Sequence, residues 1–157
     1  MTPQTAASLE LLRRFAPGAT LRTAAELIMA QGTGALILIG SGAKIDRVMS
    51  GGFRLDDAEF TAQRLAELAK MDGGIVVDEN ANRILAANVH FMPDPSIATV
   101  ETGTRFRTAE RLARQTGAAV LAVSEETHLR AVVFSGKVQF TLQSVTELLA
   151  EANQRLQ

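Results

Sequence analysis

Apolar residues recur at helical spacing in several stretches of the chain, and these stretches predict five helices. In residues 56–69, Asp56 and Glu59 have the spacing of a capping box, and an apolar stripe follows them. A helix that follows the arginines near residue 105 ends at Gly117, a residue type that favours helix C-termini. The other predicted helices cover residues 5–15, 21–30 and 145–156, with Gly32 ending the second and Ser144 and Glu147 capping the last.

Short apolar runs between turn residues predict the strands. Residues 35–39 lie between glycines, which is typical of a buried strand, and residues 45–49 follow the Ser41-Gly42 turn as its hairpin partner. Further strands are predicted at residues 75–77, 83–89, 119–123, 129–134 and 138–142. Hairpin turns imply antiparallel pairs, and strand–helix–strand steps imply parallel ones. We therefore expect an α/β fold with a single mixed, twisted sheet of about seven strands, flanked on both faces by about five helices.

Composition narrows the classes of protein to consider. The 157 residues include 16 basic and 17 acidic side chains, and a net charge of −1 gives no electrostatic footprint for nucleic acid. The chain has no cysteine, which excludes disulfides and cysteine-based metal sites. Neither a signal peptide nor an apolar run of roughly 20 residues is present, so we expect a cytoplasmic location and no membrane contact. Without a repeat or a linker, residues 1–157 are expected to form one domain.

The segment from Glu101 to Arg111 contains the strongest candidate for binding chemistry. A polar loop with Gly103 leads into a helix start that carries Arg105 and Arg107. A helix start offers free backbone N–H groups and the positive end of the helix dipole, to which arginines add forked donors. This pattern favours a phosphate site. A surface helix start with two solvated arginines is the alternative that the residues alone leave open.

Two further stretches, read together with the arginine loop, resemble the motifs of a known family. Asp72-Gly73-Gly74 precedes an apolar run, and residues 87–97 read ANVHFMPDPSI ahead of the arginine loop. In this order and at this separation, the motifs resemble the diadenylate cyclase domain of the DNA-integrity scanning proteins. The resemblance is dense over residues 71–124 and continuous over residues 9–156. That family carries an Asp-Gly-Ala motif and an Arg-His-Arg motif, so the chain departs from it at Gly74 and at Phe106. Phe106 has no polar atom and cannot do the polar work of a histidine.

The resemblance implies a reaction and a set of site residues. Diadenylate cyclases condense two ATP molecules into cyclic di-AMP and two pyrophosphates, each 3′-hydroxyl attacking the other α-phosphate with the help of a metal. Asp72 is the implied metal anchor and catalytic carboxylate, with Mg²⁺ or Mn²⁺ as its metal, and Arg105 and Arg107 are the other implied catalytic residues. The expected nucleotide-binding residues are Asp72, Gly73, Gly74, Thr104, Arg105, Phe106, Arg107, Thr108 and Ser124. Glu125 is left open between a metal-side and a solvated role, and His90 is interpreted as a surface or supporting residue.

The two-fold product also implies a partner. Because one domain holds one ATP, two copies are expected to meet face to face through an isologous contact. Scanning proteins carry a helical linker and a helix-hairpin-helix domain after the cyclase domain, and we expect neither in this segment. Since Phe106 replaces the motif histidine, we expect reduced cyclase activity. The alternative is an ATP or cyclic di-AMP binding domain with little turnover that acts in assembly or regulation. Whether the chain is a natural stand-alone protein or a truncated form stays open.

Overall fold

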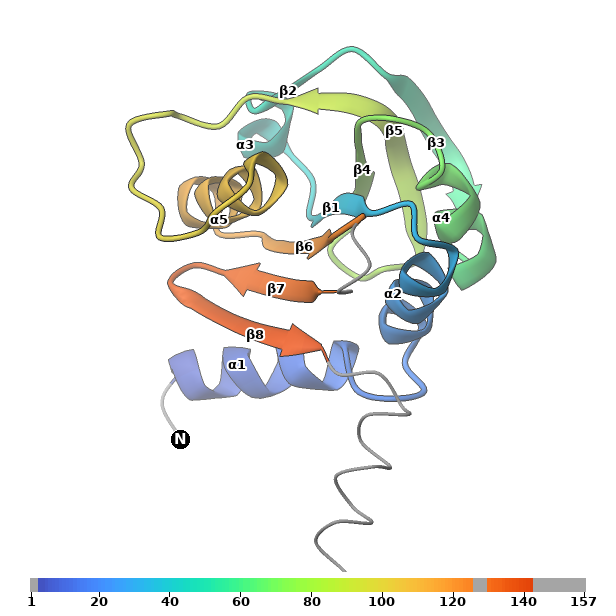
Figure 1. The fold of residues 1–157 in the computed structure, drawn as a ribbon, viewed down its shortest axis with the longest axis horizontal. Helices are drawn as coiled ribbons and strands as arrows, with labels where there is room; N and C mark the ends of the chain where they lie inside the picture. The colour runs from blue at the N-terminus through green and yellow to red at the C-terminus, as the bar shows by residue number, and fades with distance from the viewer. Residues whose placement is uncertain (1–2, 126–129, 143–157) are drawn as a thin grey trace, which may run out of the picture.

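The centre of the fold is a mixed sheet. The computed structural model describes residues 3–125 and 130–142 (Figure 1). Within this part of the chain the sheet is eight-stranded, in the order β2-β5-β4-β1-β6-β7-β8, and β3 also pairs with β5. The strands are β1 (Ala35–Ile39), β2 (Met49–Ser50), β3 (Phe53–Glu59), β4 (Gly74–Val77), β5 (Arg83–Phe91), β6 (Ala119–Val123), β7 (Ala131–Ser135) and β8 (Val138–Leu142).

Strand β1 makes the sheet mixed. It runs parallel to β4, with Ile37 opposite Ile75, and antiparallel to β6, with Ile37 opposite Leu121. The remaining pairs are antiparallel. The chain passes through two helices and two strands, residues 43–68, between β1 and β4, and such a long crossover allows a parallel pair. By contrast, short turns join β4 to β5 and β7 to β8. The predicted α/β class with a mixed sheet is therefore confirmed.

Helices cover both faces of the sheet, as Figure 1 shows. Side chains alternate along β1, so Ile37 and Leu38 point to opposite faces and belong to separate apolar clusters. The Ile37 cluster is covered by α2 and α4, and the Leu38 cluster by α3 and α5. The helices in the described residues are α1 (Pro3–Arg14), α2 (Thr20–Gln31), α3 (Ala43–Asp46), α4 (Ala62–Leu68) and α5 (Thr104–Thr116).

The predicted strand at residues 45–49 is wrong. These residues begin in the short helix α3 and reach the sheet only at Met49, in β2. Ile45 and Val48 are both buried, 4% and 1% exposed, at the three-residue spacing that places them on one side of a helical turn. The predicted hairpin therefore does not form, and β1 takes β4 and β6 as neighbours instead.

The predicted helix start at Asp56 is also wrong. Residues 53–59 form β3, which pairs with β5, and this strand brings the described sheet to eight strands rather than about seven. The helix begins after Thr61, whose hydroxyl accepts a hydrogen bond from the Arg64 backbone N–H at 3.1 Å. The hydrogen bonds gained by pairing with β5 therefore outweigh the local preference for a helix cap at Asp56.

Other helix ends agree with the sequence. Gly32 and Gly117 both adopt left-handed backbone conformations, with φ of 71° and 76°, and end α2 and α5 as predicted. The predicted helix at residues 145–156 lies outside the described residues, as do its capping residues.

Candidate functional site

The start of α5 has the features of an anion site. Gly103 precedes the helix with φ of 86° and has no side chain to cap the first N–H groups, and the first turn carries no acidic residue. The first backbone hydrogen bond of the helix runs from Arg107 N–H to the Gly103 carbonyl at 3.1 Å. The N–H groups of the first turn therefore point out of the helix start, where an anion can accept from them.

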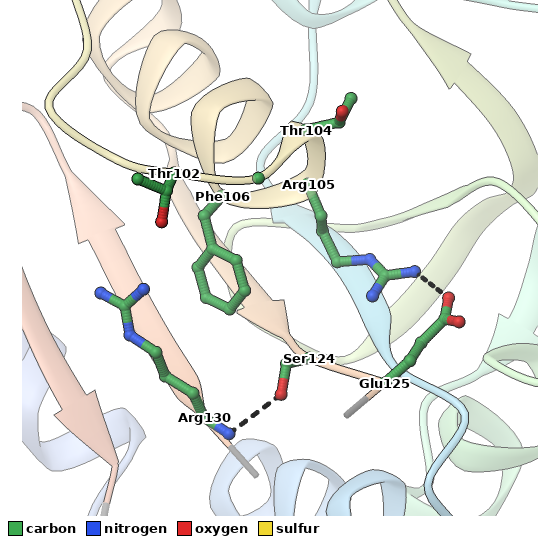
Figure 2. Close-up of a pocket in the computed structure, with 8 residues that line it drawn as sticks. Thr102, Thr104, Arg105, Phe106, Ser124, Glu125 and Arg130 are labelled. Atoms are coloured by element: carbon green, nitrogen blue, oxygen red, sulfur yellow. Dashed lines mark hydrogen bonds and ion pairs between the residues drawn. The ribbon is translucent and has the colours of Figure 1, made fainter. Parts of the chain in front are cut away.

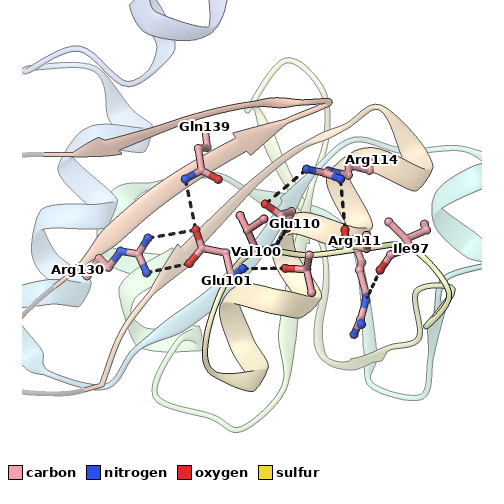
Figure 3. Close-up of polar contacts among 10 residues, drawn as sticks. Ile97, Val100, Glu101, Glu110, Arg111, Arg114, Arg130 and Gln139 are labelled. Atoms are coloured by element: carbon pink, nitrogen blue, oxygen red, sulfur yellow. Dashed lines mark hydrogen bonds and ion pairs between the residues drawn. The ribbon is translucent and has the colours of Figure 1, made fainter.

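The loop before α5 is tied to the sheet by Glu101, as Figure 3 shows. Its carboxylate is paired with both terminal nitrogens of Arg130, at 3.0 and 3.2 Å, and accepts a further hydrogen bond from Gln139 at 3.3 Å. The Glu101 side chain is only 7% exposed, so Arg130 neutralises a nearly buried charge. A bidentate arginine pair fixes geometry as well as charge, and here it holds the loop against β7 and β8.

The same loop is tied to α5 on its other side. Glu110, 3% exposed, accepts a hydrogen bond from the Val100 backbone N–H at 3.0 Å (Figure 3). Arg111 and Arg114 donate to the carbonyls of Ile97 and Ala98 at 2.9 and 3.2 Å. Because contacts on both sides fix the loop, the helix start is held in place before any ligand binds.

An Asx turn begins this loop. The backbone N–H and the hydroxyl of Ser96 both donate to the Asp94 carboxylate, at 2.9 and 2.8 Å. These two hydrogen bonds, the backbone one first, hold the pKa of Asp94 below its usual value. The Asp94 backbone N–H in turn donates to Gln115 of α5 at 2.7 Å, which places the turn against the helix.

A cleft of about 600 Å³ opens beside the helix start (Figure 2). Phe106 lies in its wall, 8% exposed, and the guanidinium carbon of Arg130 sits 4.7 Å from the centre of its ring. Ser124, at the end of β6, accepts a hydrogen bond from the Arg130 backbone N–H at 3.1 Å. The cleft is lined by Thr102, Gly103, Thr104, Arg105, Phe106, Ser124, Glu125 and Arg130.

Arg105 crosses the other side of this cleft. One terminal nitrogen donates to the Val123 carbonyl at 3.2 Å, and the other is paired with the Glu125 carboxylate. In Figure 2 the Phe106 ring stands between the side chains of Arg105 and Arg130. The cleft therefore has a guanidinium on each side of an apolar ring, with a hydroxyl at its base.

A second hollow of about 310 Å³ meets the first at Thr104 and Arg105. It has an apolar wall and a polar rim, the combination that orients a small ligand. Its lining residues are Leu36, Gly73, Gly74, Val89, His90, Phe91, Thr104, Arg105 and Thr108. The fold thus brings the glycines of the first motif to the arginine loop, which lies about 30 residues further along the chain.

The predicted site residues are not all placed alike. Those that line one or both hollows are Gly73, Gly74, Thr104, Arg105, Phe106, Thr108 and Ser124. Asp72 and Arg107 line neither: both are exposed, and the side chain of neither makes a hydrogen bond or ion pair within the described residues. Asp72 adjoins Gly73, which lines the second hollow, whereas Arg107 is an exposed residue in the first turn of α5. His90 lines the rim of the second hollow, in an exposed position on β5.

The carboxylates near the two hollows decide how a metal could be held. Among the described residues, no group of three or more His, Cys, Asp or Glu side chains could hold an ion by itself. Mg²⁺ is commonly bound by one or two carboxylates together with substrate phosphates. The exposed, unpaired carboxylate of Asp72 fits a site of that kind, in which the nucleotide supplies the other ligands.

Sequence reasoning missed four residues that shape the site, Glu101, Arg130, Leu36 and Phe91. Glu101 belongs to the arginine loop and could have been considered with it. Arg130 had no local signal, because the partners of its side chain, Phe106 and Glu101, lie 24 and 29 residues away in sequence. Leu36 and Phe91 belong to apolar strand patterns that indicate only burial.

Comparison with known proteins places this arrangement in a class of nucleotide-binding domains. Residues 22–138 match the family model described as DisA bacterial checkpoint controller nucleotide-binding. The chain belongs to this family, the DAC domains. It is 47% identical over 148 residues to the DNA integrity scanning protein DisA of Symbiobacterium thermophilum, and 48% identical over 145 residues to that of Acidothermus cellulolyticus. These matches cover 94% and 92% of the chain but only 42% and 39% of the relatives, so the chain spans about two fifths of their length.

Solved structures agree on the fold. A hypothetical membrane spanning protein from Bacillus cereus matches 80% of this chain and 62% of its own, with a TM-score of 0.67 and 27% identity. A double mutant of DacA from Staphylococcus aureus matches 84% of this chain and 91% of its own, with a TM-score of 0.61. At 23% identity, the second match supports the fold alone. In the part of the chain described here, no helix has the length and apolarity to cross a membrane.

Proposed function

We propose that this chain is a diadenylate cyclase domain, which condenses two ATP molecules into cyclic di-AMP and two pyrophosphates. In each half of the reaction, a ribose 3′-oxygen forms a bond to the α-phosphorus of the other nucleotide. The bond from that phosphorus to pyrophosphate breaks, and the hydroxyl proton leaves to a base. The observation that carries the proposal is the meeting of the α5 start with the Gly73–Gly74 hollow across Thr104 and Arg105.

The cleft supports a role in binding the triphosphate. Uncapped N–H groups at the start of α5 and the guanidinium of Arg105 would donate to phosphate oxygens. The hydroxyls of Thr104 and Ser124 lie around the same cleft. The base and ribose would then occupy the second hollow. Gly73 belongs to its lining, with a φ of 93° and the Asn88 backbone where a Cβ atom would stand, so glycine is needed to form this part of the wall.

Asp72 would hold the divalent metal together with the phosphates. When bound, Mg²⁺ or Mn²⁺ would lower the pKa of the attacking hydroxyl and neutralise charge on the phosphates. The role of Asp72 itself is to keep a carboxylate at the edge of the hollow, one that has no side-chain partner among residues 3–125 and 130–142. Its exposed position beside Gly73 supports this assignment.

A second copy of the chain would complete the site. The product has two-fold symmetry, and each copy offers one pair of joined hollows, so an isologous dimer would bring two nucleotides face to face. Arg107 is exposed and has no partner within the described residues, which supports a role toward the nucleotide or the surface of the second copy.

Phe106 is the reason to expect a lowered rate of cyclic di-AMP formation. Its ring lines the triphosphate cleft but supplies no donor, and loss of one preorganised donor typically costs about 100- to 1,000-fold in turnover. The same observation favours a second function, in which the domain binds ATP or cyclic di-AMP with little turnover and acts in assembly or regulation. The two functions differ in whether purified protein makes cyclic di-AMP at all.

The test is to incubate the protein with ATP and Mg²⁺ and quantify cyclic di-AMP by liquid chromatography. The Asp72→Asn variant should lose at least about 100-fold in rate and keep its circular dichroism spectrum, because Asp72 is exposed and has no partner in the described structure. Asp46→Asn is the matched control, since Asp46 is also exposed and its one ion pair within the described residues is with Arg54, at 3.6 Å. Turnover that is unchanged in Asp72→Asn would refute the proposed mechanism, and ATP binding without any product would favour the second function.

A further inference from the structure

The Phe91 ring occupies the space that a side chain at position 74 would need. A Cβ atom built on Gly74 would overlap the Phe91 ring at Cε2, Cδ2 and Cζ, the last at 3.0 Å. The backbone of Gly74 does not require glycine, because its φ is not in the left-handed region, in contrast to Gly73 with φ of 93°. The missing side chain at position 74 is therefore explained by the ring and not by backbone conformation.

The ring has little freedom to move away. Phe91 is 8% exposed and belongs to the apolar cluster beneath α5. It ends β5, where it pairs with Met49 of β2, and Val89 two residues earlier pairs with Gly74 of β4. Strand pairing on both sides thus fixes the backbone on either side of the contact. A methyl group at position 74 would have to displace an aromatic ring within a packed cluster.

The contact lies in the wall of the second hollow. Gly74 and Phe91 both line it, and Leu36 and Val89 extend the apolar surface. The polar rim lies on the α5 side, where Arg105 is shared with the triphosphate cleft. An apolar wall that includes an aromatic ring, next to a phosphate-binding helix start, suits the flat base of a nucleotide.

We propose that Gly74 and Phe91 act as a matched pair that shapes the base pocket of this chain. Glycine at position 74 admits the ring, and the ring supplies the wall against which the purine lies. This inference rests on the proposed nucleotide-binding function and adds which residues set the fit of the base. It also accounts for the departure at Gly74 from the family's alanine, since an alanine methyl group and this ring cannot share the space.

A double-mutant cycle tests the pairing, with binding of ATP and of inorganic triphosphate measured by calorimetry. Gly74→Ala should weaken ATP binding about 10- to 100-fold, the range for losing one base contact, and change triphosphate binding by less than about twofold. In the Phe91→Leu background, Gly74→Ala should have almost no further effect on ATP. Gly40→Ala is the control for placing a methyl group on a buried glycine, since its nearest neighbour would be the Ala118 Cβ at 3.2 Å.

If the Gly74→Ala variant does not fold, the Phe91→Leu variant by itself still tests the inference. It should weaken ATP binding and leave inorganic triphosphate binding almost unchanged, because only the base loses its wall. Equal ATP affinity in the wild type and Phe91→Leu would overturn the inference, as would an equal cost of Gly74→Ala in both backgrounds. Wild-type protein that binds neither ATP nor triphosphate would refute the proposed function itself, and the inference with it.

Discussion

The guanidinium of Arg105 is paired with the carboxylate of Glu125, and the two side chains close together over Gly34. A Cβ atom at Gly34 would lie 2.5 Å from both Arg105 Nη1 and Glu125 Cγ, and the φ of Gly34 is 70°. Glycine at this position therefore permits the pair to form above the start of β1. An arginine that is expected to bind phosphate is thus held in place by a carboxylate.

We expect Glu125→Gln to bind inorganic triphosphate about two- to fivefold more tightly than the wild type. The carboxylate competes with phosphate for Arg105, and a partly exposed ion pair is worth about 0.5–1 kcal/mol, since the Glu125 side chain is 60% exposed. Calorimetry without added metal measures the effect. Glu67→Gln is the control, because it also removes a surface carboxylate, one that pairs with Lys70 and lines neither hollow. Weaker binding in Glu125→Gln would instead indicate that Glu125 assists the ligand.

We expect Phe106→His to raise the rate of cyclic di-AMP formation by about one to three powers of ten. The substitution places a donor in the cleft where the ring now has none. The measurement is the initial rate with saturating ATP and Mg²⁺. Phe106→Leu, which fills the wall without a donor, should show no gain. An unchanged rate in Phe106→His would mean that the polar group at this position is dispensable in this chain.

We expect Arg130→Met to lower the free energy of unfolding by about 1–3 kcal/mol. The change removes the main partner of the Glu101 carboxylate, which is 7% exposed and would keep Gln139 as its one partner in the described part of the chain. Urea unfolding followed by circular dichroism measures it. Adding Glu101→Gln should recover part of the loss, because a neutral amide is less costly to bury than an unpaired charge. Equal stability of Arg130→Met and the wild type would show that solvent already satisfies Glu101.

We expect cyclic di-AMP to convert the protein to a dimer, and Arg107→Glu to prevent this. Arg107 is exposed at the α5 start and has no partner in the described residues, so a negative charge there would repel the phosphates across the dimer. Sedimentation velocity with and without cyclic di-AMP measures the association. Arg47→Glu makes the same charge change at an exposed position after α3 and should still dimerise. A monomer that produces cyclic di-AMP would contradict the face-to-face geometry.

Local sequence signals were sufficient where each residue's partners lie nearby in the chain. Gly32 and Gly117 end their helices in left-handed conformations as predicted, and residues 35–39 form a buried strand. The arginine loop could be found for the same reason, since a glycine, a helix start and two arginines fall within five residues. The α/β class followed from the alternation of such segments.

Only the tertiary structure decided the segments whose partners are distant. The capping pattern at Asp56 and Glu59 is a real local signal, yet the segment is a strand because β5 offers it a row of backbone hydrogen bonds. Likewise, Phe91 of β5 packs on Gly74 of the neighbouring strand β4, and that contact forms part of the wall of the hollow. A short-range pattern records propensities of fractions of a kcal/mol, whereas strand pairing and ring packing depend on which surfaces the chain brings together. The sequence by itself therefore determined the family, the elements with local signals and the arginine loop, and the folded sheet decided how the two hollows meet.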